Sequence, residues 1–196
     1  MGNLASVANA VDACGYDPLR CSSAAALAQA ERIILPGVGS FRTAAERLHD
    51  GGWTAALHHH VAAGRPLLGI CLGMQLLASW GEEGGGAAGL DLIPGRVEPL
   101  RVEPLRIPHV GWNSVELKRT HPCFAGIKPG RDFYFVHSYH FRVDQAEHRL
   151  AVTDYGSPVV CAVAQGSVLG LQFHPEKSQR NGLALLEAFL HWDGVA

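Results

Sequence analysis

The sequence lacks the features by which proteins hold nucleic acid or enter a membrane. Its net charge is only -2 and 17% of its residues are charged, so it has no strong basic surface for an anionic partner. No apolar run approaches the ~20 residues that a helix needs to span a bilayer. No secretory signal opens the chain. These absences argue against nucleic acid and membranes as partners.

Paired cysteines are also lacking. The chain has five cysteines, an odd number, and their spacing does not suggest a disulfide framework. Reduced thiols are typical of cytoplasmic proteins, so the sequence predicts a cytoplasmic location. The five are Cys14, Cys21, Cys71, Cys123 and Cys161.

Metal and nucleotide motifs are missing as well, although the chain has 11 histidines. The run His58–His60 is predicted to lie on a helix as a solvated face, where its side chains fan out and cannot easily share an ion. His137 and His140 have no matched cysteine or carboxylate pair. No Gly-Lys-Ser/Thr follows the glycine-rich Pro36–Gly39, which argues against a nucleotide-triphosphate loop. We expect no metal and no cofactor.

The order of the apolar segments indicates one α/β domain over residues 1–196. A chain of 196 residues is long enough to bury a core of its own. Strands are predicted at 32–35 and in the apolar run after Pro66, with helices at 43–49 and 53–63 between them. This alternation favours a central, mostly parallel sheet with helices on both faces. The C-terminal half is rich in short β patterns and ends in a helix.

One cysteine lies where the chain is predicted to change from strand to helix. The apolar run behind Gly64–Pro66 has the pattern of a strand buried on both faces, and Gly69-x-Cys71-x-Gly73 forms the junction. Small residues on both sides of the cysteine allow a sharp turn, as in the Gly-x-Ser-x-Gly elbow. A helix N-terminus there favours the thiolate. Taken alone, the segment fits a buried structural cysteine as well as a nucleophile.

A histidine and a glutamate stand two residues apart after another apolar strand. In extended geometry His174 and Glu176 point to the same side, and the carboxylate can hold the imidazole in the tautomer that a cysteine's base needs. On its own, this His-Pro-Glu segment is more simply a polar loop. Together with Cys71 it completes the nucleophile, base and orienting carboxylate of acyl transfer.

The glycine-rich segment Pro36–Gly39 ends the first predicted strand. Glycines at a strand's carboxyl end permit close approach and can direct backbone N–H groups at an anion, as an oxyanion hole requires. Without the triad, a simple glycine-rich turn would be the better interpretation.

Three segments together resemble the triad-type (class I) glutamine amidotransferases. They are GICLGMQ at 69–75, HPE at 174–176 and PGVGSF at 36–41. Two more, IPHVGWN at 107–113 and YFVHSYHF at 134–141, resemble one branch of that family, whose glutaminase subunit serves histidine biosynthesis. The resemblance covers essentially the whole chain and implies the family's single-domain α/β fold.

The resemblance implies a role for each matching residue. Cys71 is expected to attack the side-chain amide of glutamine, His174 to act as the base and then protonate the departing ammonia, and Glu176 to orient the ring. The backbone N–H groups expected at the oxyanion belong to Val38, Gly39 and Leu72. The residues expected to line the glutamine pocket are Gln75, Glu83, His137, Ser138 and Tyr139.

A partner is implied in the same way. By family analogy the ammonia passes within a heterodimer to a cyclase subunit, a (β/α)₈ barrel. The expected products are imidazole glycerol phosphate and an aminoimidazole carboxamide ribotide. The residues expected at the interface are Asn3, Trp112, Asn113 and Lys177.

The chain departs from the family at its start. Relatives begin with a strand, usually apolar residues ending in Asp-Tyr-Gly, just before the Gly-Asn seen here as Gly2-Asn3. Met1 stands in place of that strand, which would be ~5–6 residues and a turn. Its loss from a parallel sheet would leave backbone groups unpaired, so we expect that the start has been assigned too late.

Two other interpretations stay open at this point. A stand-alone cysteine hydrolase of similar architecture, such as a γ-glutamyl hydrolase, would need no docking surface and would be active without a partner. A catalytically silent binding subunit would retain the scaffold, although the intact Cys71, His174 and Glu176 argue against it.

Overall fold

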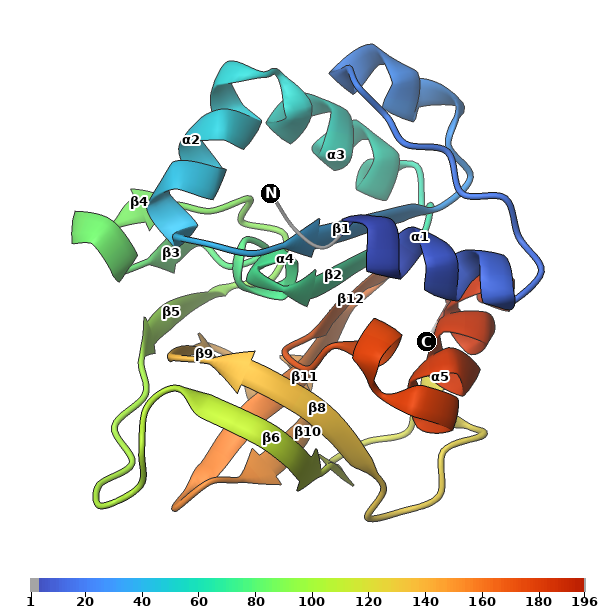
Figure 1. The fold of residues 1–196 in the computed structure, drawn as a ribbon. Helices are drawn as coiled ribbons and strands as arrows, with labels where there is room; N and C mark the ends of the chain where they lie inside the picture. Colours follow the sequence, from blue (N-terminus) through green and yellow to red (C-terminus); the bar gives the residue numbers. More distant parts are fainter. Residues whose placement is uncertain (1–3, 196) are drawn as a thin grey trace.

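A computed structural model describes residues 4–195 of the chain (Figure 1). Asn3, expected at the interface, and the start of the chain lie outside these residues. Within them, the main sheet has six strands in the order β1-β2-β12-β11-β10-β7. Their bounds are β1 Ile33–Gly37, β2 Leu67–Cys71, β12 Val168–Leu171, β11 Pro158–Gln165, β10 Arg149–Asp154 and β7 Glu116–Leu117.

The α/β fold class is confirmed, and the sheet itself is mixed. Strand β2 is parallel to β1 on one side, as the alternation of strands and helices predicts, and parallel to β12 on the other. The other described pairings of this sheet are antiparallel, β12 with β11, β11 with β10 and β10 with β7. The prediction of a mostly parallel sheet is therefore corrected: β10, β11 and β12 follow one another through short turns, and strands joined in this way pair antiparallel.

Helices cover both faces of this sheet. Figure 1 shows α2 and α3 above it, while α1 and α5 pack against each other on its other side. Leu68 and Ile70 of β2 face the core under α1 and α5, and Leu67 faces the core under α3. All of β2 is buried, as an unbroken apolar run predicts. The helix bounds are α1 Leu4–Ala13, α2 Phe41–Asp50, α3 Trp53–Ala62, α4 Leu72–Gln75 and α5 Gln179–His191.

Two smaller sheets flank the main one. A ribbon pairs β6 with β8, and the other sheet has the order β4-β3-β5-β9. The aromatic segment 133–141 is divided between them, because β8 ends just before Ser138 and β9 begins just after it. The strand bounds are β3 Trp80–Gly81, β4 Ala87–Ala88, β5 Gly95–Pro99, β6 His109–Ser114, β8 Asp132–His137 and β9 Tyr139–Val143.

Short 3-10 helices lie in the connections, and one of them follows His174. Their bounds are η1 Ala24–Gln29, η2 Glu83–Gly85, η3 Pro122–Phe124, η4 Ala146–His148 and η5 Pro175–Lys177. Between residues 4 and 195, no helix has the length and apolar character needed to cross a membrane.

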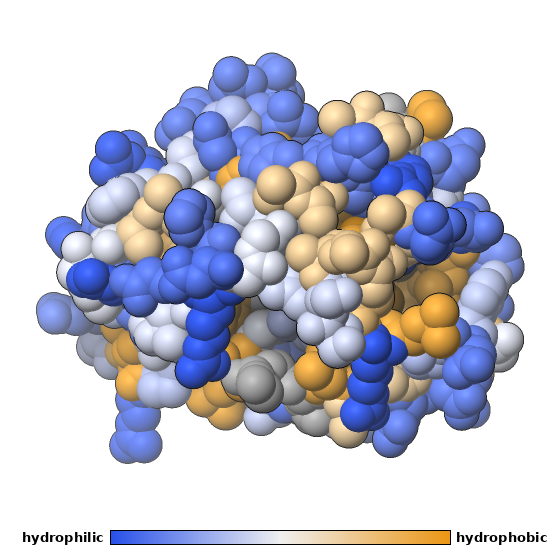
Figure 2. Space-filling model, turned by 90° about the horizontal axis from the view of Figure 1, so that it is seen from above, coloured by the Kyte–Doolittle hydropathy of each residue, from blue (hydrophilic) through white to orange (hydrophobic). Residues whose placement is uncertain are grey.

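On the face that carries α2 and α3, hydrophilic residues form most of the edge, and apolar residues lie among them (Figure 2). On α3, His58 and His59 are exposed as predicted. The prediction is wrong for His60, which is buried, with its Nε2 atom 3.0 Å from the carbonyl oxygen of Pro66. The helix turns this residue toward the sheet, because His60 and the buried Leu57 are one helical turn apart.

Candidate active site

The turn from β2 into α4 has the sharp geometry that the glycine spacing predicts. Cys71 stands at the turn with φ 54° and ψ -112°, a strained conformation for a residue with a side chain. Gly73 lies against β1, since a Cβ on it would be 1.8 Å from the carbonyl oxygen of Leu35. A Cβ on Gly69 would be 2.6 Å from the carbonyl oxygen of Gly73. Only glycine at these two positions lets the helix sit this close to the strands.

We expect Gly73→Ala to destabilise the fold by at least about 3 kcal/mol, because overpacking against a backbone atom cannot be relieved by a side-chain rotation. The measurement is chemical denaturation followed by circular dichroism. Gly126→Ala is the matched control, since no atom lies within 4 Å of the position its Cβ would take. Equal stability of the two variants would contradict the close packing described here.

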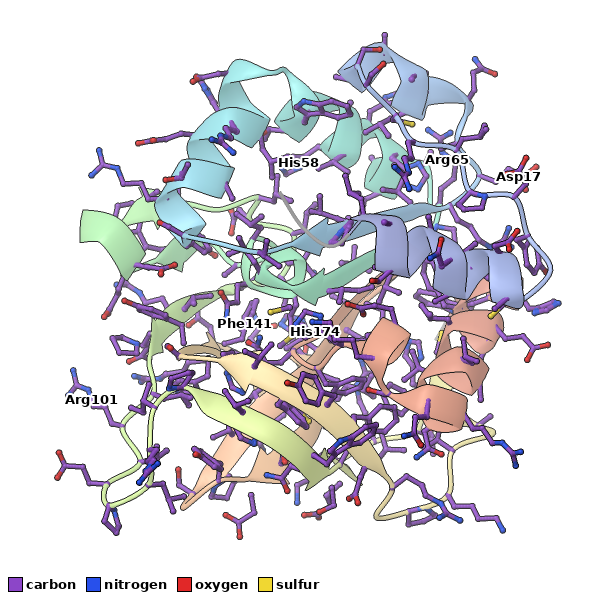
Figure 3. The ribbon with its side chains drawn as sticks, viewed as in Figure 1. Asp17, His58, Arg65, Arg101, Phe141 and His174 are labelled. Atoms are coloured by element: carbon purple, nitrogen blue, oxygen red, sulfur yellow. The ribbon has the colours of Figure 1, made fainter. Side chains whose placement is uncertain are left out.

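His174 and Glu176 form a buried pair. The Nδ1 atom of His174 is 2.7 Å from Oε1 of Glu176, and their side chains are 4% and 1% exposed. Figure 3 shows His174 in the interior of the molecule, below β2 in that view. The two residues do not lie in extended geometry as predicted, because the 3-10 helix η5 begins at Pro175 and brings Glu176 back to the imidazole.

The other ring nitrogen of His174, Nε2, is the one available to interact with the thiol of Cys71. Nε2 is buried and makes no conventional hydrogen bond to another described residue. Burial lowers the pKa of His174, but its interactions with the Cys71 thiol and the Glu176 carboxylate outweigh burial and raise the pKa to about 9. A protonated imidazole next to a cysteine is the arrangement in which the sulfur attacks and the ring later gives its proton to a leaving amine.

The raised pKa of His174 predicts a pH dependence of stability. The ordinary value is 6.5 and the folded value is about 9, so the stabilisation is complete below pH 6.5 and is lost as the pH rises through 9. A shift of this size corresponds to roughly 3 kcal/mol. We expect the free energy of unfolding to fall between pH 6.5 and 9.5, and to fall less steeply in Glu176→Gln. Identical slopes, measured by denaturant titration at several pH values, would contradict this account.

The loop that carries His174 is fastened to β8 by a residue that sequence reasoning missed. Ser178 is fully buried, and its hydroxyl donates to the carbonyl oxygen of His174 (2.6 Å) and accepts from the backbone N–H of Tyr134 (3.0 Å). The N–H of His174 in turn donates to the carbonyl oxygen of Tyr134 (2.9 Å). Two of these hydrogen bonds therefore join the His174 loop to Tyr134 of β8, and the third ties Ser178 to His174 within the loop.

The residues predicted for the oxyanion hole lie at neighbouring strand ends. Gly37 pairs with Cys71 in the register of β1 and β2, and a Cβ on it would be 2.9 Å from the Cβ of Leu72. Val38 and Gly39 follow directly, the latter with φ 102°, a conformation that favours glycine. Leu72 is the first residue of α4. The backbone after β1 therefore runs close to the nucleophile's own turn.

The predicted glutamine-pocket residues fall into two groups. Gln75, His137 and Tyr139 are joined, since Gln75 Nε2 and His137 Nδ1 both donate to the carbonyl oxygen of Tyr139, at 3.2 and 2.8 Å. Ser138 lies between the last two. Glu83, on η2, stands apart from them. Its Oε2 accepts from the backbone N–H of Phe41, the first residue of α2, at 2.6 Å.

The predicted interface residues are also divided. The indole of Trp112, on β6, lies edge-on to the Tyr134 ring at 6.0 Å, and the Nζ of Lys177 lies 5.8 Å from the centre of the same ring. These three make one exposed cluster beside the His174 loop, in which Trp112 and Lys177 are exposed and Tyr134 is half-buried. Asn113 turns inward instead, and its Nδ2 donates to the carbonyl oxygen of Asp154 (2.8 Å).

A second residue that sequence reasoning missed is Gln172. Its side chain is completely buried, with Oε1 accepting from Gln75 Nε2 at 3.0 Å and Nε2 3.8 Å from the sulfur of Cys71. The available signal was a glutamine inside an otherwise apolar strand end, because a buried amide needs hydrogen-bond partners. Within residues 4–195, no three His, Cys, Asp or Glu side chains gather as metal ligands would.

Comparison with known families identifies this architecture. The model of the family "Glutamine amidotransferase class-I" matches residues 9–192. The chain belongs to this family. The match spans the elbow, the segment after β1 and the His-Pro-Glu loop, so every part of the candidate site falls inside the amidotransferase region.

Named relatives of this amidotransferase are similar over nearly their whole length. "Imidazole glycerol phosphate synthase subunit HisH" of Symbiobacterium thermophilum is 48% identical over 186 residues, 95% of this chain and 87% of the relative. The protein of the same name from Moorella thermoacetica is 46% identical over 189 residues, 96% of this chain and 90% of the relative.

Solved structures agree on the fold. A crystal structure described as a glutamine amidotransferase has a TM-score of 0.77 at 22% identity and covers 99% of this chain and 95% of its own. PurLQS from Thermotoga maritima has a TM-score of 0.73 at 17% identity, with 96% and 92% covered. At such identities the likeness concerns the fold alone.

Proposed function

We propose that this amidotransferase is the glutaminase subunit of an imidazole glycerol phosphate synthase. It hydrolyses glutamine and passes the ammonia to a cyclase subunit, for histidine biosynthesis. The observation that carries the hydrolytic part is the buried His174–Glu176 pair facing Cys71 at a glycine elbow. The assignment within the family is supported by the name of the relatives that are 46–48% identical to this chain.

The reaction uses the triad in order. The sulfur of Cys71 attacks the side-chain amide carbon of glutamine, and the oxyanion faces backbone N–H groups of Val38 or Gly39 and of Leu72. As the tetrahedral intermediate collapses, His174 gives its proton to the leaving nitrogen, and ammonia departs from a γ-glutamyl thioester. Water, deprotonated by the now neutral His174, attacks the thioester, which releases glutamate and restores the thiol.

The exposed side of β6 is the proposed docking surface for the cyclase. Val110 and Trp112 are 55% and 48% exposed on this strand, and Lys177 stands beside Trp112 on Tyr134. An apolar centre with charged residues around it is typical of protein interfaces. A polar hollow of about 420 Å³ between Trp112 and the start of α5 extends the same surface.

The docking proposal predicts a large effect at Trp112. Since buried aromatic residues carry much of the binding energy of an interface, Trp112→Ala should weaken the complex with the cyclase by ~2 kcal/mol or more, about 30-fold in Kd. Trp80→Ala is the matched control, because Trp80 is similarly exposed but lies on β3. Isothermal titration calorimetry measures both, and equal affinities would contradict this docking surface.

The proposed function itself is tested with both subunits. With purified cyclase, its ribonucleotide substrate and glutamine, we expect release of glutamate and formation of imidazole glycerol phosphate and aminoimidazole carboxamide ribotide. Glutamate release without any cyclase product would favour the stand-alone hydrolase. We place this reaction in the cytoplasm, which the free cysteines support, because thiols remain reduced there.

A further inference from the structure

A continuous hydrogen-bonded network joins the nucleophile to the exposed strand β6. It begins at Asn113, passes through two buried histidines and two buried glutamines, and ends at the Cys71 sulfur. The triad mechanism uses only the last member of this network, Cys71. Its members, in order, are Asn113, His109, His137, the carbonyl of Tyr139, Gln75, Gln172 and Cys71.

The histidine part of the network has only one arrangement of protons. A carbonyl oxygen only accepts, so His137 Nδ1 donates to Tyr139 (2.8 Å) and its Nε2 must accept from Nδ1 of His109 (3.0 Å). His109 Nε2 then accepts from Nδ2 of Asn113 (3.3 Å). Burial lowers the pKa of His109, and it lowers that of His137 to about 4, so both rings are neutral at pH 7.

Asn113 cannot reverse this direction. Its Oδ1 accepts from the backbone N–H of Ser114 (2.8 Å), and its Nδ2 donates to the carbonyl oxygen of Asp154 (2.8 Å). The His109 ring is also held in place, because it stacks on the rings of Phe135 and Tyr155, with ring centres 4.7 and 3.9 Å away. The Tyr139 carbonyl therefore accepts from a donor of fixed orientation, Nδ1 of His137.

The glutamine part is fixed by the same carbonyl. Gln75 Nε2 donates to Tyr139 (3.2 Å) and to Oε1 of Gln172 (3.0 Å). With its oxygen held by Gln75, Gln172 must turn its amide N–H group toward the sulfur of Cys71, 3.8 Å away. On its other side the Cys71 thiol donates to the carbonyl oxygen of Val136 (3.8 Å), a group that favours the thiol over the anion.

We propose that Gln172 is a positioning residue for the nucleophile, whose N–H group stabilises the Cys71 thiolate and is aimed at it by the hydrogen bonds that Gln75 makes to Gln172 and to the carbonyl of Tyr139. This proposal rests on the proposed glutaminase function and names a residue that acts through Cys71. An amide donor offsets the Val136 carbonyl once the sulfur loses its proton, because hydrogen bonds to charged groups are stronger than those to neutral ones.

The test is the pH profile of Cys71 alkylation by iodoacetamide in the full chain, followed by mass spectrometry. Gln172→Met removes the donor at similar volume. We expect its alkylation midpoint to lie about one pH unit above that of the unaltered protein, with kcat lowered about tenfold and KM for glutamine unchanged. The titratable groups near Cys71 are His174 with Glu176 behind it and His137 on β8, and the substitution leaves all three in place.

Controls separate a local from a general effect. Gln165→Met alters an exposed glutamine at the end of β11 and should leave the profile unchanged, while the exposed Cys21 is a reference thiol within each sample. If Gln172→Met does not unfold cooperatively, Gln172→Leu replaces it. Leu also removes the donor and adds no charge beside the sulfur, so the midpoint should again rise.

The outcomes are distinct. An unchanged or lowered midpoint in a folded Gln172 variant would overturn the positioning role, and so would a raised KM with unchanged kcat, which would make Gln172 a substrate-binding residue. Failure of the proposed function looks different, because glutamate release by the unaltered protein would then survive complete alkylation of Cys71.

Discussion

Replacing Cys71 with alanine is expected to abolish glutamine hydrolysis, with a loss on the order of 10⁴–10⁶ in kcat, as for other covalent catalysts that lose their nucleophile. In the proposed mechanism the sulfur forms the thioester, and no neighbouring group in the described site offers another nucleophile of that kind. Binding of the cyclase should be nearly intact, because Cys71 is buried away from the exposed face of β6. The measurements are glutamate release under saturating cyclase and its substrate, and the Kd of the complex.

Controls for this variant come from the rest of the chain. Cys21→Ala should retain full activity, since Cys21 is exposed. His174→Ala should be nearly as severe as Cys71→Ala, whereas Glu176→Gln should be milder because it keeps a side chain that can orient the imidazole. A Cys71→Ala protein that still released glutamate at the original rate would remove the amidotransferase mechanism altogether.

The local patterns of the sequence were enough to predict the nucleophile's turn. Glycines at 69 and 73 are required by contacts of less than 3 Å with backbone atoms, so spacing in the sequence translates directly into geometry. The parallel pairing of β1 with β2 was likewise predictable, because helices α2 and α3 connect the two strands as a crossover.

The parts that escaped prediction depend on contacts between distant segments. Gln172 meets Gln75 across 97 positions and Cys71 across 101, and no local pattern encodes such a pairing. Ser178 looks like an ordinary loop residue until β8 is placed beside it. The division of 133–141 at Ser138 likewise depends on two separate partner strands, β6 and β5.

Tyr134, on β8, touches both the His174 loop and the proposed docking surface. The carbonyl of Tyr134 holds the N–H of His174, while the ring of the same residue lies in the exposed cluster with Trp112 and Lys177. The proposed docking surface and the base are therefore supported by one residue of β8. We expect a cyclase bound at this cluster to act on the His174 loop through Tyr134.

The isolated chain should therefore hydrolyse glutamine at least ~10²–10³ times more slowly than its complex with cyclase and cyclase substrate, the value of one oxyanion donor. Gly37 and Gly39 flank Val38, and Gly39 has φ 102°, so the peptide that we propose as an oxyanion donor can rotate at low cost. We infer that docking shifts the population toward the state with its N–H directed at the oxyanion.

This last prediction separates a coupled amidotransferase from a free hydrolase. Turnover is measured for the chain alone, with cyclase, and with cyclase plus a substrate analogue, and it should rise at each step. Trp80→Ala should show the same activation as the unaltered chain, while Trp112→Ala should need more cyclase to reach it. Equal turnover with and without cyclase would refute the coupling and favour the stand-alone hydrolase, because ammonia made without a waiting acceptor is lost to water.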